Sequence, residues 1–259
     1  MATGRNDRGI RKFIGKLVNM VCFGIMFFSS YQIISILYDY YANRQVLAEI
    51  QEVYQESRDG EDSQEGGDMK GIRSSFTELL RINPDIVGWI EIPGTDISYP
   101  VLQAENNEFY LTRNYKKEKS RAGSIFMDYR NDVKDLKRNV ILYGHRMKDD
   151  SMFGQLDKYL SEPFFRRHRT IYFDTLYESY DAEVFAVYKT TTDFYYIDTD
   201  FSTDEEYLSF VRRLLDRSVY KTGLAIGPDD PVLTLSTCDY TFPGGKGRLV
   251  IHARLKKKM

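Results

Sequence analysis

Uncharged stretches, short alternating segments and polar linkers follow one another along the chain, and each predicts a different kind of structure. The first uncharged stretch covers residues 17–38. As a helix it is long enough to cross the hydrocarbon core of a bilayer, which needs roughly 20 residues. Its polar residues are too scattered to define one face, which argues against a buried helix of a soluble domain. We therefore predict a transmembrane helix over residues 17–38.

The residues before this helix predict its orientation. Residues 1–16 carry several arginines and lysines, and basic residues stay on the cytoplasmic side of a membrane. A cleaved signal peptide has a shorter apolar region, of about 7–15 residues, and a small-residue cleavage site, and we see no convincing site here. We expect an uncleaved signal-anchor, with a cytoplasmic basic tail and the rest of the chain on the outer, cell-wall side.

Residues 39–71 divide into two parts of different composition. Apolar residues at near-helical spacing over residues 39–56 predict a juxtamembrane helix. Residues 57–71 are rich in glycine, serine and acidic side chains, which cannot bury a core, so they predict a flexible acidic spacer. The extracellular domain is therefore expected to cover residues 72–259, and its chemistry is expected to be independent of residues 1–38.

From Ile72 onward, short apolar segments alternate with polar turns. The strongest helix pattern covers residues 204–216, where acidic residues fill the first turn and Ser202 or Thr203 can cap it. Many short strands with few helices predict a mainly β fold, a small closed barrel. The expected strands cover residues 89–92, 98–103, 123–128, 139–143, 170–175, 179–190, 231–238 and 248–255, and further short helices are expected at 74–82 and 151–160.

The strand over residues 231–238 delivers a cysteine to its end. Because side chains alternate along a strand, Leu233 and Leu235 point to one face, and Thr234, Ser236 and Cys238 point to the other. The thiol therefore lies opposite the leucines, where a substrate can reach it. The alternative is an ordinary buried cysteine, because free cysteine is commonly buried.

Two other apolar strands have a histidine or an arginine at one end. His145 follows the strand over residues 139–143, and Arg248 begins the last strand, on the face opposite Leu249 and Ile251. A cysteine, a histidine and an arginine at strand ends are the parts of a thiol acyl-transfer site. Without such a site, His145 would be a solvated loop histidine and Arg248 a solvated strand residue.

These elements together resemble a known family. The combination Leu142-Tyr-Gly-His145, Thr234-Leu-Ser-Thr-Cys238 and Arg248 is similar to the sortases, the cysteine transpeptidases of Gram-positive cell surfaces. The similarity extends from about Ile82 to the C-terminus. A helix before the first strand and a helical insert before the Cys238 strand resemble class B. The resemblance implies a closed sortase-type barrel of about eight strands with peripheral helices.

The resemblance also implies roles for the three residues. Cys238 is the nucleophile, in its thiolate form. His145 protonates the departing amine and later accepts a proton from the incoming amine. Arg248 stays charged, so it donates hydrogen bonds to the substrate backbone or to the developing oxyanion.

Three neighbouring residues are weaker candidates for substrate binding. Ser236 shares the face of Cys238 and can hydrogen-bond a substrate, and Tyr143 can border the groove. Thr237 is expected to pack inward and fix the strand.

The remaining histidines and the overall charge indicate no further chemistry. His168 lies in a basic turn, and His252 is four residues from Arg248, roughly 13 Å along the strand, which makes it a poor partner for Cys238. No cluster has metal-ligand spacing, so we expect neither a metal nor a cofactor. The net charge of −2 does not support a nucleic-acid partner.

The predicted function is that of a membrane-anchored class B sortase. By the resemblance, it cleaves a secreted protein after the threonine of a C-terminal sorting signal and holds the protein as a thioester on Cys238. It then passes the protein to an amine of peptidoglycan or its precursor. The alternatives are a pilus-assembling transpeptidase, a mainly hydrolytic cysteine peptidase and a non-catalytic membrane-tethered binding module. Class B resemblance suggests a signal of the Asn/Ser-Pro-x-Thr-Gly/Asn kind.

Overall fold

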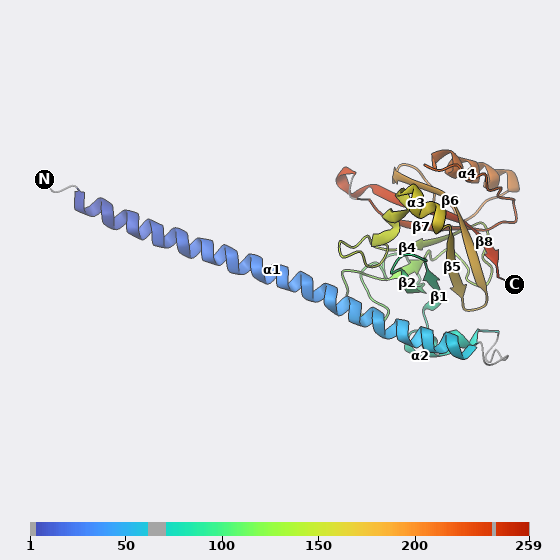
Figure 1. Cartoon of the computed structure of the whole chain (residues 1–259), viewed down its shortest axis with the longest axis horizontal. Helices are drawn as coiled ribbons and strands as arrows, with labels where there is room; N and C mark the ends of the chain where they lie inside the picture. Colours follow the sequence, from blue (N-terminus) through green and yellow to red (C-terminus); the bar gives the residue numbers. More distant parts are fainter. Residues whose placement is uncertain (1–3, 62–70, 240–241, 259) are drawn as a thin grey trace. The chain divides into compact units, whose positions relative to one another are not determined.

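The computed structural model describes residues 4–61, 71–239 and 242–258 (Figure 1). The chain divides into two compact units, Met1–Arg44 and Gln45–Met259. A long helix, α1 (Gly4–Glu61), begins in the first unit and ends in the second. In the first unit the predicted span, residues 17–38, is helical throughout, and its apolar side chains are exposed. This part of α1 is long and apolar enough to cross a membrane.

The second unit is built around a closed barrel, as the sequence predicts. Among the described residues, its eight strands follow the order β1-β2-β3-β4-β7-β8-β6-β5. They are β1 (Ile86–Glu91), β2 (Ser98–Leu102), β3 (Ile125–Met127), β4 (Asn139–Tyr143), β5 (Thr170–Thr175), β6 (Ser179–Thr191), β7 (Val232–Cys238) and β8 (Gly247–Lys257).

The alternation of apolar residues determines which face of each strand points into the barrel. Leu233 and Leu235 of β7 join Leu249 and Ile251 of β8 in the interior core, as predicted. The core covers the inner face of the sheet, and burying side chains of this kind stabilises the fold by about 1.5–3 kcal/mol each. The opposite faces of these strands contact helices or carry side chains of the site described below.

Short helices surround the barrel. These are η1 (Ser74–Phe76), α2 (Thr77–Ile82), η2 (Gly154–Leu160), α3 (Glu162–Arg167), α4 (Asp204–Arg217) and η3 (Pro243–Gly245). The hydroxyl of Thr203 caps α4 by accepting a hydrogen bond from the Glu206 amide, as predicted. Buried residues of α4, including Tyr207 and Phe210, share a hydrophobic cluster with Tyr188 of β6, Val232 of β7 and Val250 of β8, so this helix covers the outer face of the sheet at β6 and its neighbours (Figure 1).

Several predicted elements differ in extent. The strand expected over residues 123–128 contains only Ile125–Met127, and the helix expected over residues 151–160 is a 3₁₀ helix over Gly154–Leu160. The short helix α3 was not predicted, because six residues show too little periodicity to distinguish a helix from a turn.

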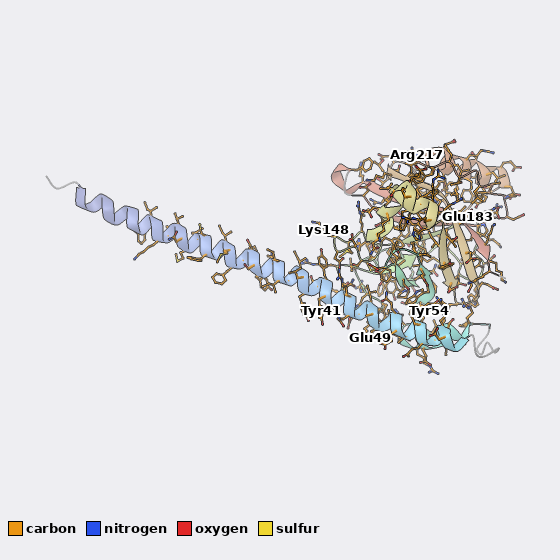
Figure 2. All side chains as sticks on the ribbon, in the orientation of Figure 1. Tyr41, Glu49, Tyr54, Lys148, Glu183 and Arg217 are labelled. Atoms are coloured by element: carbon orange, nitrogen blue, oxygen red, sulfur yellow. The ribbon has the colours of Figure 1, made fainter. Side chains whose placement is uncertain are left out.

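The C-terminal part of α1 belongs to the barrel unit. Ile50 and Tyr54, one helical turn apart, are fully buried in a cluster with Trp89. Figure 2 labels Tyr54 and Glu49 on this part of the helix, and Glu49 forms an ion pair of 2.7 Å with Lys116. The sequence predicts the start of the domain near Ile72 and the spacer from residue 57. The structure instead has α1 extending to Glu61, while residues 62–70 lie outside the described residues.

Candidate active site

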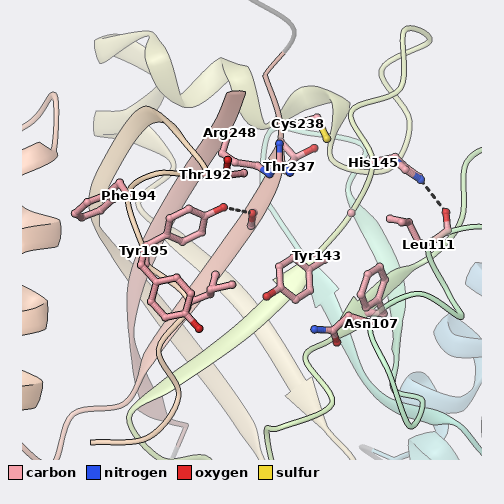
Figure 3. Close-up of a pocket in the computed structure, with 15 residues that line it drawn as sticks. Asn107, Leu111, Tyr143, His145, Thr192, Phe194, Tyr195, Thr237, Cys238 and Arg248 are labelled. Atoms are coloured by element: carbon pink, nitrogen blue, oxygen red, sulfur yellow. Dashed lines mark hydrogen bonds between the residues drawn. The ribbon is translucent and has the colours of Figure 1, made fainter. Parts of the chain in front are cut away.

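A pocket of about 350 Å³ opens at one end of β4, β7 and β8 (Figure 3). Every site residue that the sequence singled out lines it: Tyr143, His145, Ser236, Thr237, Cys238 and Arg248. The strand pairing explains why they meet. Strand β4 runs parallel to β7 with Tyr143 opposite Ser236, and β7 runs antiparallel to β8 with Cys238 opposite Arg248.

Cys238 ends strand β7 as a free, half-buried thiol. The next residue, Asp239, is buried, and its amide donates to the Gly247 carbonyl at 2.9 Å. A Cβ atom at Gly247 would lie 2.1 Å from the Asp239 carbonyl oxygen, so only glycine fits there. This close backbone approach places the start of β8 beside the cysteine.

The carboxylate of Asp239 connects the histidine and cysteine ends of the site. It forms an ion pair with Arg146, the residue after His145, with Nη1 and Oδ1 3.6 Å apart. It forms a second ion pair with Lys189 of β6, with Nζ and Oδ2 3.0 Å apart. A buried carboxylate needs such partners, because burial without them disfavours its charge. The two pairs therefore hold the ends of β4, β6 and β7 together.

His145 follows Gly144 at the end of β4. A Cβ atom at Gly144 would come within 2.4 Å of Ile125 and 2.7 Å of Phe153, so the chain turns there in tight contact with the core. The Nε2 atom of His145 lies 2.7 Å from the carbonyl oxygen of Leu111 (Figure 3). Since a carbonyl can only accept, Nε2 carries a proton and donates it. In the neutral ring Nδ1 is then the nitrogen that can take up a proton.

The guanidinium of Arg248 is fixed by its own turn. Its Nη1 atom donates to the carbonyl oxygens of Gly245 at 2.9 Å and Gly247 at 2.8 Å. In Figure 3 the side chain lies beside Thr237 and Cys238. A guanidinium group is a permanent cation, so Arg248 provides a fixed positive charge next to the thiol.

Tyr143 and Ser236 are paired on the neighbouring strands β4 and β7, and the side chain of each makes a hydrogen bond. The Tyr143 hydroxyl donates to Asp128 at 2.9 Å, and burial together with that carboxylate raises the pKa of Tyr143. Ser236 Oγ lies 2.8 Å from the hydroxyl of Tyr196. Both side chains therefore line the pocket and are held in place by these hydrogen bonds.

Thr237 is buried, as its inward direction predicts, and also lines the pocket. Its hydroxyl has no hydrogen-bond partner among the residues that the structure describes.

The other walls come from Phe126 of β3 and from two loops that the sequence does not predict to reach the site. The loops contribute Asn107, Leu111, Thr192, Phe194, Tyr195, Tyr196 and Ile197. Three consecutive aromatic residues, 194–196, interrupt a polar connection between a strand and a helix. That cluster was the available signal, because binding residues are often on loops and aromatic rings supply large contact areas.

His252 and His168 lie apart from the pocket-lining set. His252 is fully buried, and burial lowers its pKa to about 3. The ring of His168 packs on Phe164, with ring centroids 4.5 Å apart. Within the described residues, no group of three or more histidines, cysteines or carboxylates could hold a metal ion.

Comparison with known proteins identifies relatives over most of the chain. The family model described as "Sortase domain" matches residues 90–256. Sortase B of Listeria monocytogenes is 41% identical over 249 residues, covering 96% of this chain and 99% of the relative. Sortase B of Staphylococcus aureus is 42% identical over 186 residues, covering 72% of this chain and 76% of the relative.

Solved structures agree with these sequence relatives. Sortase B from Bacillus anthracis in complex with AAEK2 is 55% identical, with a TM-score of 0.77, covering 85% of this chain and 98% of that chain. The Staphylococcus aureus sortase B–substrate complex is 38% identical, with a TM-score of 0.77, covering 84% of this chain and 98% of that chain.

Proposed function

Because this chain belongs to the sortase family, and within it to class B, we propose that it anchors secreted proteins to the cell wall. As a cysteine transpeptidase it exchanges one amide bond for another. The proposed substrate is a secreted protein with a C-terminal sorting signal, cleaved after a threonine. The proposed acceptor is an amine of peptidoglycan or its precursor.

One relationship carries this proposal: Cys238 lies directly opposite Arg248 at the mouth of a pocket that His145 also lines. Strand β4 pairs with β7 in parallel register up to Tyr143 and Ser236. His145 follows two residues after Tyr143 and lines the same pocket. A nucleophile, a proton carrier and a permanent cation thus border one peptide-sized pocket.

The first half of the reaction forms a thioester. The Cys238 sulfur attacks the threonine carbonyl carbon, the carbon–sulfur bond forms, and the peptide C–N bond breaks. His145 gives a proton to the departing amine. In the doubly protonated ring that proton resides on Nδ1, because Nε2–H stays bonded to the Leu111 carbonyl.

The second half reverses the proton transfer. The incoming amine attacks the thioester carbonyl and gives its proton to His145. The carbon–sulfur bond then breaks, and the thiolate is restored. In both halves Arg248 donates hydrogen bonds to the carbonyl oxygen while it carries negative charge, and such donors contribute most in a site that excludes water.

The proposed substrate groove runs between Tyr143 and the loop that carries Tyr195 and Ile197. The apolar rings suit the non-polar parts of a sorting signal. Ser236, on the same face of β7 as Cys238, and its neighbour Thr237 also line the pocket. We assign Tyr143, Ser236 and Thr237 to substrate binding on this basis, and the preferred signal is of the Asn/Ser-Pro-x-Thr-Gly/Asn kind.

The apolar part of α1 is proposed to be the membrane anchor. The helix is long and apolar enough to cross a bilayer, and the basic residues precede it. That order retains the N-terminus inside and places the catalytic unit on the cell-wall side.

The proposal is tested with the full chain in detergent and a peptide of the Asn/Ser-Pro-x-Thr-Gly/Asn kind, with and without an added amine such as triglycine. Mass spectrometry should show cleavage after threonine and, with the amine, a product joined to it. Cys238→Ala is the control and should give neither product. Cleavage elsewhere, or products unaffected by the amine at any concentration, would contradict a transpeptidase of this specificity.

A further inference from the structure

Three consecutive backbone carbonyls in the pocket wall accept hydrogen bonds from side chains behind them. Asn139 Nδ2 donates to Tyr196 O at 3.1 Å and to Asp198 O at 2.8 Å. Arg130 Nη2 donates to Ile197 O at 2.9 Å. Residues 195–200 lie in neither helix nor strand. The position of this wall therefore depends on side-chain donors rather than on a strand ladder.

The chemistry of its neighbours fixes the orientation of the Asn139 amide. Carbonyl oxygens only accept, so the NH₂ group must face Tyr196 and Asp198, and both of its hydrogens are used there. Oδ1 then faces Thr234, whose hydroxyl donates to it. A rotated amide would place its oxygen against two carbonyl oxygens.

The direction of the hydrogen bond between His252 and Thr234 is determined in the same way. Its single hydrogen is given to Asn139, so the Nδ1 atom of His252, 2.8 Å from Thr234 Oγ1, must be the donor to that oxygen. The other ring nitrogen, Nε2, lies 2.8 Å from the Tyr188 hydroxyl and accepts from it. The hydrogen bonds thus point one way, from Tyr188 through His252 and Thr234 to Asn139, and each bond polarises the next.

These four residues are buried and lie behind the pocket rather than in it. Asn139, Thr234 and His252 have no exposed surface, and Tyr188 is 1% exposed. They are not among the described residues that line the pocket. Burial lowers the pKa of His252 to about 3, so its ring stays neutral and keeps one donor and one acceptor near neutral pH. Their influence on a substrate must pass through residues 196–198.

We propose that Asn139 is a positioning residue for the substrate groove, held in its working orientation by the Tyr188–His252–Thr234 chain with His252 as the Nδ1–H tautomer. The role rests on the proposed function, because the wall that Asn139 holds is the proposed wall of the sorting-signal groove. Asn139 touches no substrate. It fixes the carbonyls of Tyr196 and Asp198, and so the side chains of Tyr195, Tyr196 and Ile197 that face the pocket.

Two variants of the full chain in detergent test this role. Asn139→Asp keeps the size of the side chain but removes both donors. Tyr188→Phe removes only the hydroxyl that donates to His252. Tyr159→Phe is the matched control, because Tyr159 is an equally buried tyrosine whose hydroxyl donates to the His168 carbonyl, outside the pocket. The probe is the sorting-signal peptide used above.

The expected result is a split between the kinetic constants. Loss of two hydrogen bonds to the wall should raise KM on the order of tenfold in Asn139→Asp and two- to threefold in Tyr188→Phe. The rate of Cys238 alkylation by iodoacetamide should not change, since the thiol is untouched. Tyr159→Phe should keep the wild-type KM. An unchanged KM in a folded Asn139→Asp, or an equal rise in Tyr159→Phe, would overturn the positioning role.

Two measurements are independent of activity. Nitrogen-15 NMR of the wild-type ring should show a protonated Nδ1 and an unprotonated Nε2 at His252, and the opposite tautomer would refute the chain. Hydrogen exchange should accelerate at residues 195–198 in Tyr188→Phe and not in Tyr159→Phe; unchanged exchange there would also refute it. A wild-type enzyme that cleaves no sorting peptide would refute the proposed function. The NMR and exchange results would still decide whether the hydrogen bonds from Tyr188 to Asn139 hold residues 195–198.

Discussion

The ring of Tyr54 in α1 stacks on Trp89 in β1, with the ring centroids 4.0 Å apart and the planes inclined by 11°. The Tyr54 hydroxyl also donates to Asp174 of β5 at 2.7 Å. Both rings are buried, and Ile50 lies in the same cluster. The last turns of α1 therefore form part of the catalytic unit rather than a linker to it.

This stack predicts where the catalytic unit begins. A chain starting at Gln45 should unfold at the temperature of the full-length protein, whereas one starting at Ile72 should lose much of its stability. Tyr54→Ala alone should cost about 3–5 kcal/mol, as for other buried aromatic residues. Thermal and urea unfolding measure both effects. Tyr41→Ala, which changes an exposed residue of the first unit, is the control. Equal stability of the two shortened chains would contradict this boundary.

A second prediction concerns Arg248. Arg248→Lys should lower the peptide-cleavage rate by about 10²–10³, although the charge is kept, because lysine cannot reproduce the planar fork of a guanidinium. The rates of Arg248→Lys and Arg248→Ala are compared with wild type, and Cys238 alkylation is followed in parallel. A lysine variant with a near-wild-type rate would show that charge alone suffices.

The glycine that begins β8 gives a third prediction. A methyl group at Gly247 would collide with the Asp239 carbonyl oxygen, so Gly247→Ala should displace the start of β8 from the cysteine. We expect at least a tenfold loss of kcat/KM, since misplacement of a reacting group by about 1 Å can cost on the order of a hundredfold. Gly227→Ala, where the new atom meets only an ordinary contact, should behave as wild type. Full activity of Gly247→Ala would mean that the turn does not set the site geometry.

A fourth prediction follows from the lowered pKa of His252. Its pKa falls from 6.5 in the unfolded chain to about 3 in the folded protein, because burial disfavours the cation. Below pH 6.5 the unfolded state binds a proton that the native state does not. As the pH is lowered from about 6.5 to 3, the free energy of unfolding should therefore decrease, and His252 should contribute about 1.4 kcal/mol of this decrease per pH unit.

Urea unfolding at a series of pH values checks the slope. His252→Gln should reduce it over that range. An identical slope in wild type and His252→Gln would contradict the burial of a neutral ring.

The sequence predicted the parts of this molecule that local patterns determine. Strand β4 has the predicted bounds, and alternation in β7 and β8 correctly put Leu233 and Leu249 in the core. The short motifs around His145, Cys238 and Arg248 identified three residues that the barrel brings to one pocket. Each of these features is encoded within a few neighbouring residues.

The features that the sequence does not predict depend on contacts between distant residues. Tyr54 packs against Trp89, 35 positions later, so its spacing suggested only a juxtamembrane helix. Asn107 and Ile197 reach the pocket from loops whose paths are set by tertiary contacts, including the bond from Arg130 to the Ile197 carbonyl. No periodic pattern marks such residues, because loops carry none.

The covalent intermediate is the most direct test of the proposed chemistry. The full chain is mixed with a sorting-signal peptide without amine, quenched in acid, digested and analysed by mass spectrometry. We predict an adduct on the Cys238 peptide with the mass of the substrate ending at threonine, which disappears when an amine is added before the quench. Cleavage of the peptide by Cys238→Ala, or turnover by wild type with the adduct on any other residue, would contradict it.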